Sequence, residues 1–520
     1  MNKPSRRFQP AMSPQQIKIR LRGQSLTLAE ASALAMQLHQ LKNFPAVLEI
    51  YDSMLAKLPN SAEVHNNRGA VLQQLRRFDE ALASYRKAVA LKPDYANAHH
   101  NCGSLLKLLR RYDEALASYD RAVALNPGHA EAHNNRGAIL MNKGEMAEAE
   151  QAFQKAIALK PDFAAPLFNL VSIRKYPGTD HADEKNLQAL LTKPGLPLEV
   201  QEQIYYSLGK IYDDGGRYDG AFNYYRLANE IRNATVVYDP AAITRTANEL
   251  MEVFSRDFLA QPSASASESR SPLFIVGMPR SGTTLLASIL SNHRAIATAG
   301  ELPTIAELTL RLPELAGSGI SYPQAATRIS SDAAITLAKV YEQRLRRDFG
   351  ADVPHIIDKS PLNFWHLGFI TRLFPQARII HCTRDAMATG LSNYFQRFPV
   401  EYHYSFDLRN IGHFQGEYAR LMAHWRKVLP RPMLEVSYED MITGTEQVAR
   451  TALDFLGLDW DERCLAPHTN PCVVETASVW QVRQPIYREA VEKWRHYEKH
   501  LAPLKEALIA SGQFPELTGT

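Results

Sequence analysis

The sequence has few cysteines and no long apolar segment. Its four cysteines form no CxxC pair and no ligand spacing with histidine, so the sequence shows neither a zinc motif nor a disulfide framework. They are Cys102, Cys382, Cys464 and Cys472. No run of 18 apolar residues occurs, so no membrane-spanning helix is predicted. The first residues, MNKPSRRFQP, lack the apolar stretch of a signal peptide, and we expect a cytoplasmic protein.

The sequence also lacks a strong net charge. Its formal charge of +4, from 59 basic and 55 acidic residues, is too small to indicate nucleic-acid binding. A basic pocket for an anionic ligand remains compatible with it, because such a pocket needs only a few residues. With 45% hydrophobic and 22% charged residues the chain has the composition of folded protein, and 520 residues exceed one ordinary domain.

The first half of the chain repeats every 34 residues. The recurring positions are Ala81, Ala115 and Ala149; Tyr85, Tyr119 and Phe153; Gly69, Gly103 and Gly137; and Pro59, Pro93, Pro127 and Pro161. Each period predicts two helices that cross at the small residue, with the aromatic residue on the second helix and the proline ending it. The pattern resembles the tetratricopeptide repeat.

This resemblance implies an α-solenoid over residues 28–235, preceded by an N-terminal segment, 1–27. Three units are clear, a weaker one precedes them, and a degenerate one starts near Ala164. A further unit restores the pattern at 202–235. The clear units are 62–95, 96–129 and 130–163, and the weaker one is 28–61. One departure is histidine where a large apolar residue is usual, at His65, His99 and His133.

Asparagine recurs at one position of four successive units, two residues before the small residue where one is present. These residues are Asn67, Asn101, Asn135 and Asn169. They resemble the asparagine ladder of the repeats in glycosyltransferases that attach N-acetylglucosamine to protein hydroxyls. That resemblance implies a concave groove whose amides bind an extended peptide, since each amide offers a donor and an acceptor. A solvated polar face copied by repeat duplication is the other interpretation.

A Ser/Pro-rich segment, 261–272, separates the repeats from a phosphate-loop pattern and is a predicted linker, within a connecting region of 236–272. The apolar run 273–276 then leads into GMPRSGTT and an amphipathic segment. Strand, glycine-rich turn and helix direct backbone N–H groups at an anion. Thr283 replaces the lysine of GxxxxGK[ST], and Arg280 lies inside the loop, which disfavours a nucleotide kinase or hydrolase.

The loop resembles the 5′-phosphosulfate loop of sulfotransferases that use phosphoadenosine phosphosulfate (PAPS), most closely the tyrosylprotein sulfotransferase-like branch. The resemblance implies an α/β P-loop-like domain with a central parallel sheet over 273–505, followed by a C-terminal tail, 506–520. It implies PAPS as donor, PAP as product and no metal. The loop residues implied to bind the 5′-phosphosulfate are Arg280, Ser281, Gly282, Thr283 and Thr284.

Further donor contacts follow from the same resemblance. Arg384 and Ser392 match the pair that binds the 3′-phosphate, and a guanidinium with a hydroxyl suits a phosphomonoester. Arg397, shortly after this serine, is another candidate cation. Tyr438, in the segment VSYED, matches a tyrosine that lies near the nucleotide; a buried strand tyrosine is the alternative.

The resemblance also implies residues for the transfer step. Lys359, in IIDKSP, matches the lysine that contacts the sulfuryl group. Ser478 and Arg483, in the closing segment SVWQVRQP, match a serine and a cation near the phosphosulfate bridge. Glu301 stands at the distance from Arg280 expected of the catalytic base, with His293 as the competing base.

Together the motifs predict an enzyme that moves a sulfuryl group from PAPS to an acceptor hydroxyl. A tyrosine of a protein or peptide, docked with help from the repeat groove, is the acceptor that the resemblance favours. A carbohydrate or small-molecule sulfotransferase whose repeats recruit partners is the alternative within enzymes. A non-catalytic repeat scaffold is the alternative outside them. Neither nucleic acid nor a membrane is expected as a partner.

Overall fold

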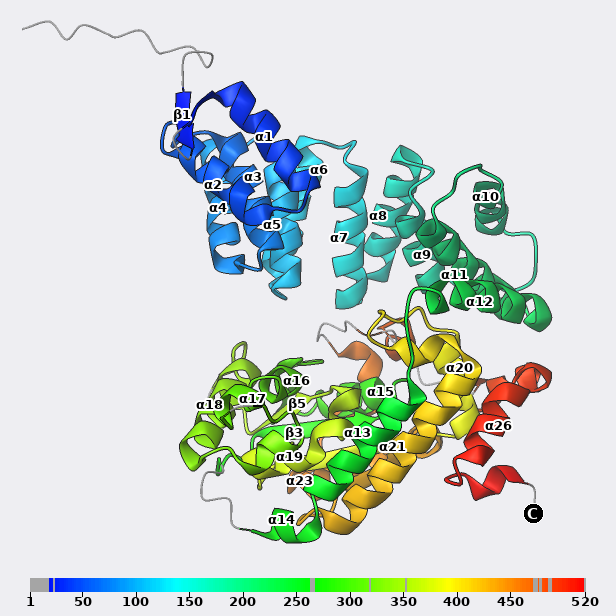
Figure 1. The fold of residues 1–520 in the computed structure, drawn as a ribbon. Helices are drawn as coiled ribbons and strands as arrows, with labels where there is room; N and C mark the ends of the chain where they lie inside the picture. Colours follow the sequence, from blue (N-terminus) through cyan, green and yellow to red (C-terminus); the bar gives the residue numbers. More distant parts are fainter. Residues whose placement is uncertain are drawn as a thin grey trace, which may run out of the picture. The chain divides into compact units, whose positions relative to one another are not determined.

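The computed structural model describes residues 18–21, 24–261, 267–317, 319–350, 353–470, 476, 479–484 and 489–518 (Figure 1). It divides into two compact units. The first runs to residue 169 without 142–144, and the second comprises 142–144 and 170–520. Within the described ranges, no helix is long and apolar enough to cross a membrane.

The first unit begins with an antiparallel hairpin of β1 (Lys18–Leu21) and β2 (Gln24–Thr27) and continues as paired helices. The helices are α1 (Leu28–Gln40), α2 (Phe44–Leu55), α3 (Ala62–Gln74), α4 (Phe78–Leu91), α5 (Ala96–Leu108), α6 (Tyr112–Leu125), α7 (Ala130–Lys143), α8 (Met146–Leu159) and α9 (Ala164–Ile173). Each clear 34-residue period therefore forms two helices, as the tetratricopeptide-repeat pattern predicts.

The recurring glycine is the contact point of each helix pair. A Cβ atom added at Gly69 would lie 2.7 Å from Tyr85 Cε1, and one at Gly137 would lie 2.7 Å from Phe153 Cε1. Because packed interiors leave no room for an extra carbon, any larger residue would push the aromatic ring away. The predicted crossing of two helices at a small residue, beneath an aromatic ring, is therefore confirmed.

The unusual histidines fasten the turns between repeats. The Nε2 atoms of His65, His99 and His133 lie 3.0, 3.0 and 3.1 Å from a proline carbonyl oxygen six residues earlier. These carbonyl groups belong to Pro59, Pro93 and Pro127, which follow the second helix of the preceding unit. The histidine thus contributes a hydrogen bond to a backbone carbonyl of the turn at a position where a large apolar residue is usual.

The boundary between the units falls within α9, and the second unit continues with further helices before its sheet. The first helices are α10 (Ala182–Leu191), α11 (Leu198–Asp214), α12 (Tyr218–Asn233) and α13 (Pro240–Val253). The later helices are α14 (Arg256–Ala260), α15 (Thr283–Leu290), α16 (Thr304–Thr309), α17 (Leu312–Leu315), α18 (Ser331–Leu345), α19 (Leu367–Leu373), α20 (Ala386–Tyr394), α21 (Leu408–Val428), α22 (Tyr438–Thr443), α23 (Thr445–Leu456), α24 (Val479–Val482), α25 (Glu489–Glu492) and α26 (Ala502–Ala510). Short 3₁₀ helices include η3 (Pro361–His366), η4 (His403–Phe406) and η7 (Lys493–His500).

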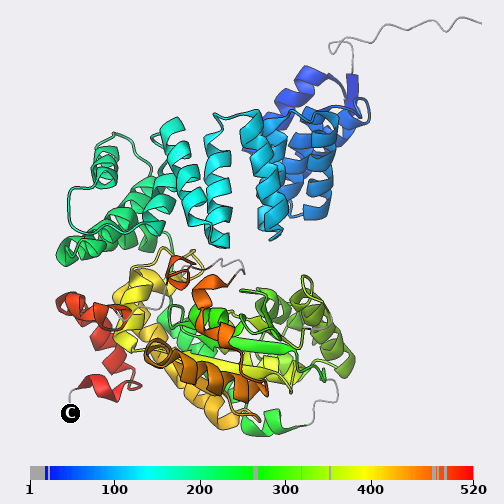
Figure 2. The same cartoon turned by 180° about the vertical axis from the view of Figure 1, so that it is seen from behind.

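Five parallel strands form the sheet of this unit, in the order β4-β5-β3-β6-β7 (Figure 2). They are β3 (Pro272–Gly277), β4 (Ile296–Thr298), β5 (His355–Asp358), β6 (Arg378–Thr383) and β7 (Leu434–Ser437). Every residue of the central strand β3 is buried, which explains its continuous apolar sequence. The predicted α/β domain with a central parallel sheet is thus confirmed.

The repeat at 202–235 belongs to the same compact unit as the sheet. Its helices α11 and α12 cross like those of the earlier repeats, because a Cβ atom at Gly209 would lie 3.0 Å from Tyr225 Cδ1. The compact unit nevertheless groups this repeat with the strands. The connecting helix α13 also lies along α21, where the Thr244 hydroxyl donates to Glu417 Oε1 at 2.7 Å.

Candidate functional site

The five strands of the sheet end at the segments that the sequence singled out. Glu301 follows β4, Lys359 follows β5, residues 278–284 follow β3, Arg384 follows β6 and Tyr438 follows β7. Because all five strands are parallel, their carboxyl ends lie at one edge of the sheet. Segments that begin at residue 278 and extend to residue 438 therefore meet in one row, in the order of the strands.

Glycine is required at both ends of the loop after β3. Gly277 has φ 154°, and a Cβ atom there would lie 2.4 Å from the Cys382 carbonyl oxygen. Gly282 has φ 97°, and its Cβ atom would lie 2.6 Å from Met441 Cε. The chain turns between these residues, and α15 then begins at Thr283, so the N–H groups of the first helical turn open onto the loop.

Arg280 is held in an unusual backbone conformation at the centre of this loop. Its φ of 71° is left-handed, which is rare for a residue with a Cβ atom. Its Nε donates to Ser392 Oγ at 3.0 Å, and its terminal nitrogen donates to Gln481 Oε1 at 2.6 Å. Arg384 donates to the Arg280 carbonyl oxygen at 3.0 Å. Side chains from α20, α24 and the end of β6 thus fix one arginine.

A pocket lies over the loop. Arg280 and Arg384 provide its cations, and the Arg384 guanidinium lies 4.4 Å from the centre of the Tyr438 ring. The pocket is lined by Arg280, Gly282, Thr283, Thr284, Leu285, Arg384, Tyr438, Ile442, Gln481, Val482 and Gln484. Beneath it, the Ser281 side chain is 1% exposed, and its hydroxyl has no hydrogen-bond partner among the described residues. Two guanidinium groups and a buried hydroxyl suit an anionic, phosphate-bearing ligand.

Glu301 and Lys359 form an ion pair at the neighbouring strand ends. Lys359 Nζ donates to Glu301 Oε1. The lysine side chain is 4% exposed, whereas the glutamate side chain is 37% exposed. Backbone bonds hold the two segments together, since the Lys359 N–H donates to the Gly300 carbonyl at 2.9 Å. The arrangement presents a carboxylate to solvent and keeps a buried cation directly behind it.

A buried carboxyl group supports this pair from below. Asp358 is fully buried and accepts from the Tyr341 hydroxyl at 2.9 Å, the Ser360 hydroxyl at 2.7 Å and Asn363 Nδ2 at 3.3 Å. Burial raises the pKa of Asp358 to about 6, and its hydrogen bonds oppose that rise. The Ser360 hydroxyl also contacts the Leu302 carbonyl at 3.0 Å, so one cluster fixes the residues flanking both Glu301 and Lys359.

Two of the predicted cations lie elsewhere. Arg397 donates to both carboxylate oxygens of Glu202, at 2.9 and 3.1 Å, and is absent from the pocket lining. Arg483 donates to the Asn470 carbonyl oxygen. Ser478 lies outside the described residues. The structure thus brings together the loop residues, Arg384, Ser392 and Tyr438, and pairs Glu301 with Lys359.

The competing base, His293, is engaged on both ring nitrogens. Its Nδ1 accepts from the Ala295 N–H at 3.1 Å, so Nε2, 3.1 Å from the Asp459 carbonyl oxygen, donates to it. The ring is 5% exposed. A neutral histidine that bonds two backbone groups is a structural residue, which favours Glu301 among the two candidate bases.

Sequence reasoning missed residues that complete the site. Gln481 lies in the closing segment that was singled out, yet its contact with Arg280 had no signal in the spacing. Asn393 is fully buried, and its Nδ2 donates to the Pro279 carbonyl at 2.8 Å. Asp358 could have been suspected from its place immediately before Lys359. The contacts of Gln481 and Asn393 join segments more than 100 residues apart and have no periodic pattern.

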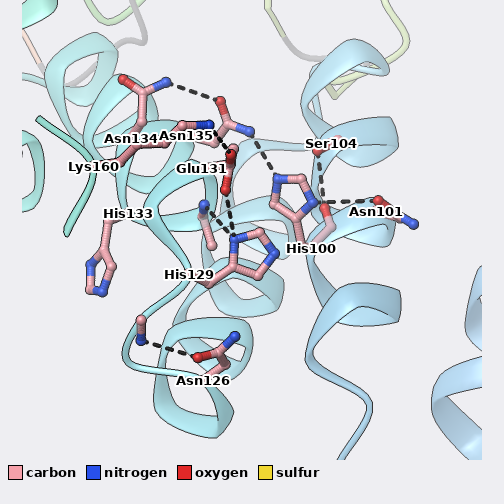
Figure 3. A network of polar contacts seen from close by, with 12 residues as sticks. His100, Asn101, Ser104, Asn126, His129, Glu131, His133, Asn134, Asn135 and Lys160 are labelled. Carbon is pink, nitrogen blue, oxygen red and sulfur yellow. Dashed lines mark hydrogen bonds and ion pairs between the residues drawn. The ribbon is translucent and has the colours of Figure 1, made fainter. Parts of the chain in front are cut away.

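Three residues of the asparagine ladder contact side chains of the preceding repeat in the first unit. Asn101 donates to Asn66 Oδ1 at 2.9 Å, and Asn169 donates to Asn134 Oδ1 at 3.0 Å. Between them, Asn135 Nδ2 lies 3.2 Å from His100 Nε2 (Figure 3). Each bond joins a ladder residue to the repeat before it. The ladder therefore ties successive repeats together, and each inter-repeat bond engages one of the two N–H groups of an amide.

Burial and the neighbouring His129 lower the pKa of His100. The centroids of the two rings are 4.6 Å apart, and Figure 3 shows the rings next to each other. A neutral His100 can accept from Asn135 on Nε2 and donate from Nδ1, which lies 3.4 Å from Asn101 Oδ1. Uncharged His100 thus serves as the partner of a ladder residue, at the position where Asn66 and Asn134 serve in the neighbouring repeats.

Family comparisons match both parts of the chain. The model described as "Sulfotransferase family" matches residues 272–462. Models described as "Tetratricopeptide repeat" match residues 60–127, 104–162 and 202–235.

The chain also matches curated proteins over part of their length. It is 33% identical over 345 residues to an uncharacterized protein of Aquifex aeolicus (strain VF5), covering 65% of this chain and 45% of that one. It is 26% identical over 253 residues to the protein-tyrosine sulfotransferase of Drosophila melanogaster, covering 43% of this chain and 46% of that one. The chain thus spans about half the length of these two curated relatives. The solved structure of MamA covers 39% of this chain and 96% of its own, at 22% identity and a TM-score of 0.26.

Proposed function

The chain joins tetratricopeptide repeats to a domain of the sulfotransferase family, and on this premise we propose that it transfers a sulfuryl group from PAPS to the hydroxyl of a peptide tyrosine. One observation carries the proposal. A phosphate loop, two arginines and a glutamate–lysine pair meet at the carboxyl edge of one parallel sheet. Ligands of open α/β sheets bind at this edge.

The residues of the pocket fit the proposed donor. The buried Ser281 hydroxyl offers a donor that no described residue engages, and the first N–H groups of α15 open onto the same loop. Arg280 and Arg384 supply fixed positive charge, and Ser392 places a hydroxyl beside Arg280. When bound, PAPS supplies an activated sulfuryl group on a phosphate leaving group. Arg384 and Ser392 are the proposed contacts of its 3′-phosphate, and residues 280–284 those of its 5′-phosphosulfate.

Glu301 is the proposed base. Its half-exposed carboxylate can accept the proton of an acceptor hydroxyl, and Lys359 holds that carboxylate in one place. Lys359 also provides a positive charge next to the reacting oxygens, where it stabilises negative charge that develops during transfer. Both residues are fixed before substrate arrives by the hydrogen bonds around Asp358.

A peptide acceptor is supported by the repeats and by the named relatives. Several matched proteins are named protein-tyrosine sulfotransferases. Each ladder amide carries both donor and acceptor groups, which suit the backbone of an extended peptide. We propose that the ladder of Asn67, Asn101, Asn135 and Asn169 docks the acceptor chain.

The test is PAPS turnover by the full chain with a tyrosine-peptide library and a sugar panel as acceptors. Arg280→Ala and Glu301→Gln should each lower kcat/KM by about 10²-fold or more, because each removes charge stabilisation or the base. The exposed Lys427→Ala is the matched control. Sulfate on sugars alone would overturn the peptide acceptor. Failure of the wild type to bind PAPS would overturn the donor.

A further inference from the structure

The last repeat, 202–235, differs from the others at three polar positions. Counting from the glycine where the helices cross, Glu202 stands where the clear units have alanine, and Asn229 stands where they have valine or isoleucine. Asp213 stands where they have glutamine, lysine or methionine. The matching residues are Ala62, Ala96 and Ala130; Val89, Val123 and Ile157; and Gln73, Lys107 and Met141.

All three polar side chains are buried. Glu202 and Asn229 are each 1% exposed, and Asp213 is 8% exposed. A buried charge or amide costs free energy unless it is paired, so each of these residues needs a partner outside the ordinary repeat pattern.

The partners belong to segments beside the donor pocket. Glu202 binds Arg397 through both carboxylate oxygens, and Asn229 Nδ2 donates to the Tyr394 carbonyl at 2.8 Å. The ring of Phe395 stacks on Tyr225 of the repeat at a centroid distance of 3.9 Å. The repeat therefore holds the chain from 394 to 397, at the end of α20.

The same end of α20 holds the phosphate loop from its other side. Ser392 accepts from Arg280 Nε, and Asn393 donates to the Pro279 carbonyl. Residues 392 and 393 therefore contact the loop, while residues 394, 395 and 397 contact the repeat. The end of α20 therefore lies between the last repeat and the phosphate loop and contacts both.

A second contact leads to η7. Asp213 pairs with Lys493 and accepts from the Tyr497 hydroxyl at 2.7 Å. The Tyr497 ring also meets Phe395, at a centroid distance of 4.8 Å. The Asp213 carboxylate thus links η7 to the last repeat. Tyr497 of η7 packs against Phe395, the ring that stacks on Tyr225.

From these contacts we infer that the last repeat is a positioning element of the donor site. Glu202, Asn229 and Asp213 are positioning residues, which act on the phosphate loop through α20 and η7. Arg397 belongs to the same device, as the partner of Glu202. This repeat thus uses these side chains to order the loop around Arg280. The kinetic arm of the test rests on the proposed function; the structural arm does not.

The structural arm is hydrogen exchange of the full chain, read at residues 278–284 and 392–398. Asn229→Val restores the residue type of the other repeats, and Glu202→Gln removes the charge that faces Arg397. Each should raise exchange at both segments by about tenfold, the equivalent of losing roughly one or two hydrogen bonds. Glu131→Gln, which breaks an exposed pair with Lys160 in the first unit, is the control and should leave both segments unchanged.

The kinetic arm compares PAP binding and the kinetics with PAPS. The two variants should raise the KM for PAPS by about tenfold and change kcat by about twofold or less, since the reacting groups stay in place. Glu202→Asp, which keeps the carboxylate, should restore part of the affinity. If Glu202→Gln does not fold, Asp213→Asn tests the same device through Lys493 and Tyr497.

The two arms separate the two proposals. Unchanged exchange at 278–284 in the folded variants would overturn the positioning role, whatever the ligand. Increased exchange in a protein whose wild type does not bind PAP would support the positioning role and overturn the proposed donor.

Discussion

The repeat at 130–163 and the repeat at 202–235 have the same interior and different surfaces. In both, a glycine of the first helix lies against an aromatic ring of the second, Gly137 with Phe153 and Gly209 with Tyr225. In the repeat at 130–163, Asn135 contacts His100 of the preceding repeat. In the repeat at 202–235, Asn229 and Glu202 bind Tyr394 and Arg397 at and just after the end of α20, within the region that the sulfotransferase-family model matches. A repeat motif therefore specifies how two helices pack and leaves their outward partners to the remaining positions.

The difference follows from a few substitutions on one scaffold. Alanine at the position of Glu202, and valine or isoleucine at the position of Asn229, suit packing against another repeat. A buried glutamate or amide at the same positions suits a partner that offers a guanidinium or a carbonyl group, as Arg397 and Tyr394 do. Four changes in the chain would test how far this comparison holds.

Truncation should have the largest effect. A chain of residues 170–520 should fold and bind PAP, because it keeps the second unit nearly whole. A chain of residues 236–520 should fail to fold, because it exposes Tyr394, Phe395 and Tyr497 and leaves Arg397 without Glu202. Circular dichroism, thermal melting and PAP calorimetry would measure both. Equal behaviour of the two chains would contradict the integration of the last repeat.

The pH dependence of Asp358 should be the next largest. Because the pKa of Asp358 rises from 3.8 to about 6 on folding, the folded state holds its proton more tightly. Its contribution to stability is full below pH 3.8 and is lost as the pH rises through 6. The free energy of unfolding of the wild type relative to Asp358→Asn should therefore fall by about 3 kcal/mol across that range. Exposed Asp332→Asn is the control in urea titrations; a flat difference would contradict the prediction.

Glycine-to-alanine changes in the two repeats should separate stability from function. Gly137→Ala and Gly209→Ala each place a carbon against an aromatic ring, and each should lower the free energy of unfolding by about 1–3 kcal/mol. Only Gly209→Ala should also weaken PAP binding, because its helix pair holds α20. Urea unfolding and calorimetry would measure the two effects. A loss of PAP affinity in Gly137→Ala would contradict the prediction that only the last repeat affects PAP binding.

The smallest effect should come from His100. Because folding lowers its pKa, neutral His100 contributes stability above its ordinary pKa of 6.5, and this is lost as the pH falls. Protonation would also place an N–H group against Asn135, weakening one ladder bond by about 1 kcal/mol. His129 and Glu131 are the titratable neighbours of His100. His100→Asn, which copies Asn66 and Asn134, should remove this acid sensitivity from the proposed peptide docking, measured at pH 5.5 and pH 7.5. An unchanged pH profile would contradict the role of His100.

Local sequence was enough to predict the repeats and the ends of four strands. The 34-residue period reports contacts between helices adjacent in the chain, and Gly69 with Tyr85 is such a contact. The glycine-rich loop and the residues Lys359, Arg384 and Tyr438 each follow an apolar strand, so their place at the sheet edge was predictable. Strand β4 has only three residues, Ile296–Thr298, and too few for a pattern to be recognised.

The roles of the buried polar residues could not be read in the same way. Asp358, Asn393 and Glu202 belong to no recognisable sequence motif. Their structural roles depend on hydrogen-bond partners that local sequence patterns do not reveal. Arg397 is an example: the resemblance made it a candidate cation after Ser392, and only the structure shows that its guanidinium pairs with Glu202. Sequence separation between the two is 195 residues.

The sequence by itself determined the two kinds of architecture, the phosphate loop and the row of strand-end residues, because these depend on periodicity and on neighbours along the chain. Only the tertiary structure decided that Glu301 pairs with Lys359, that the ladder asparagines bond to Asn66, His100 and Asn134 of the preceding repeats, and that the last repeat contacts the end of α20 beside the phosphate loop. Those outcomes depend on which buried charges and amides meet across the fold, and the free-energy cost of leaving them unpaired selects the partners.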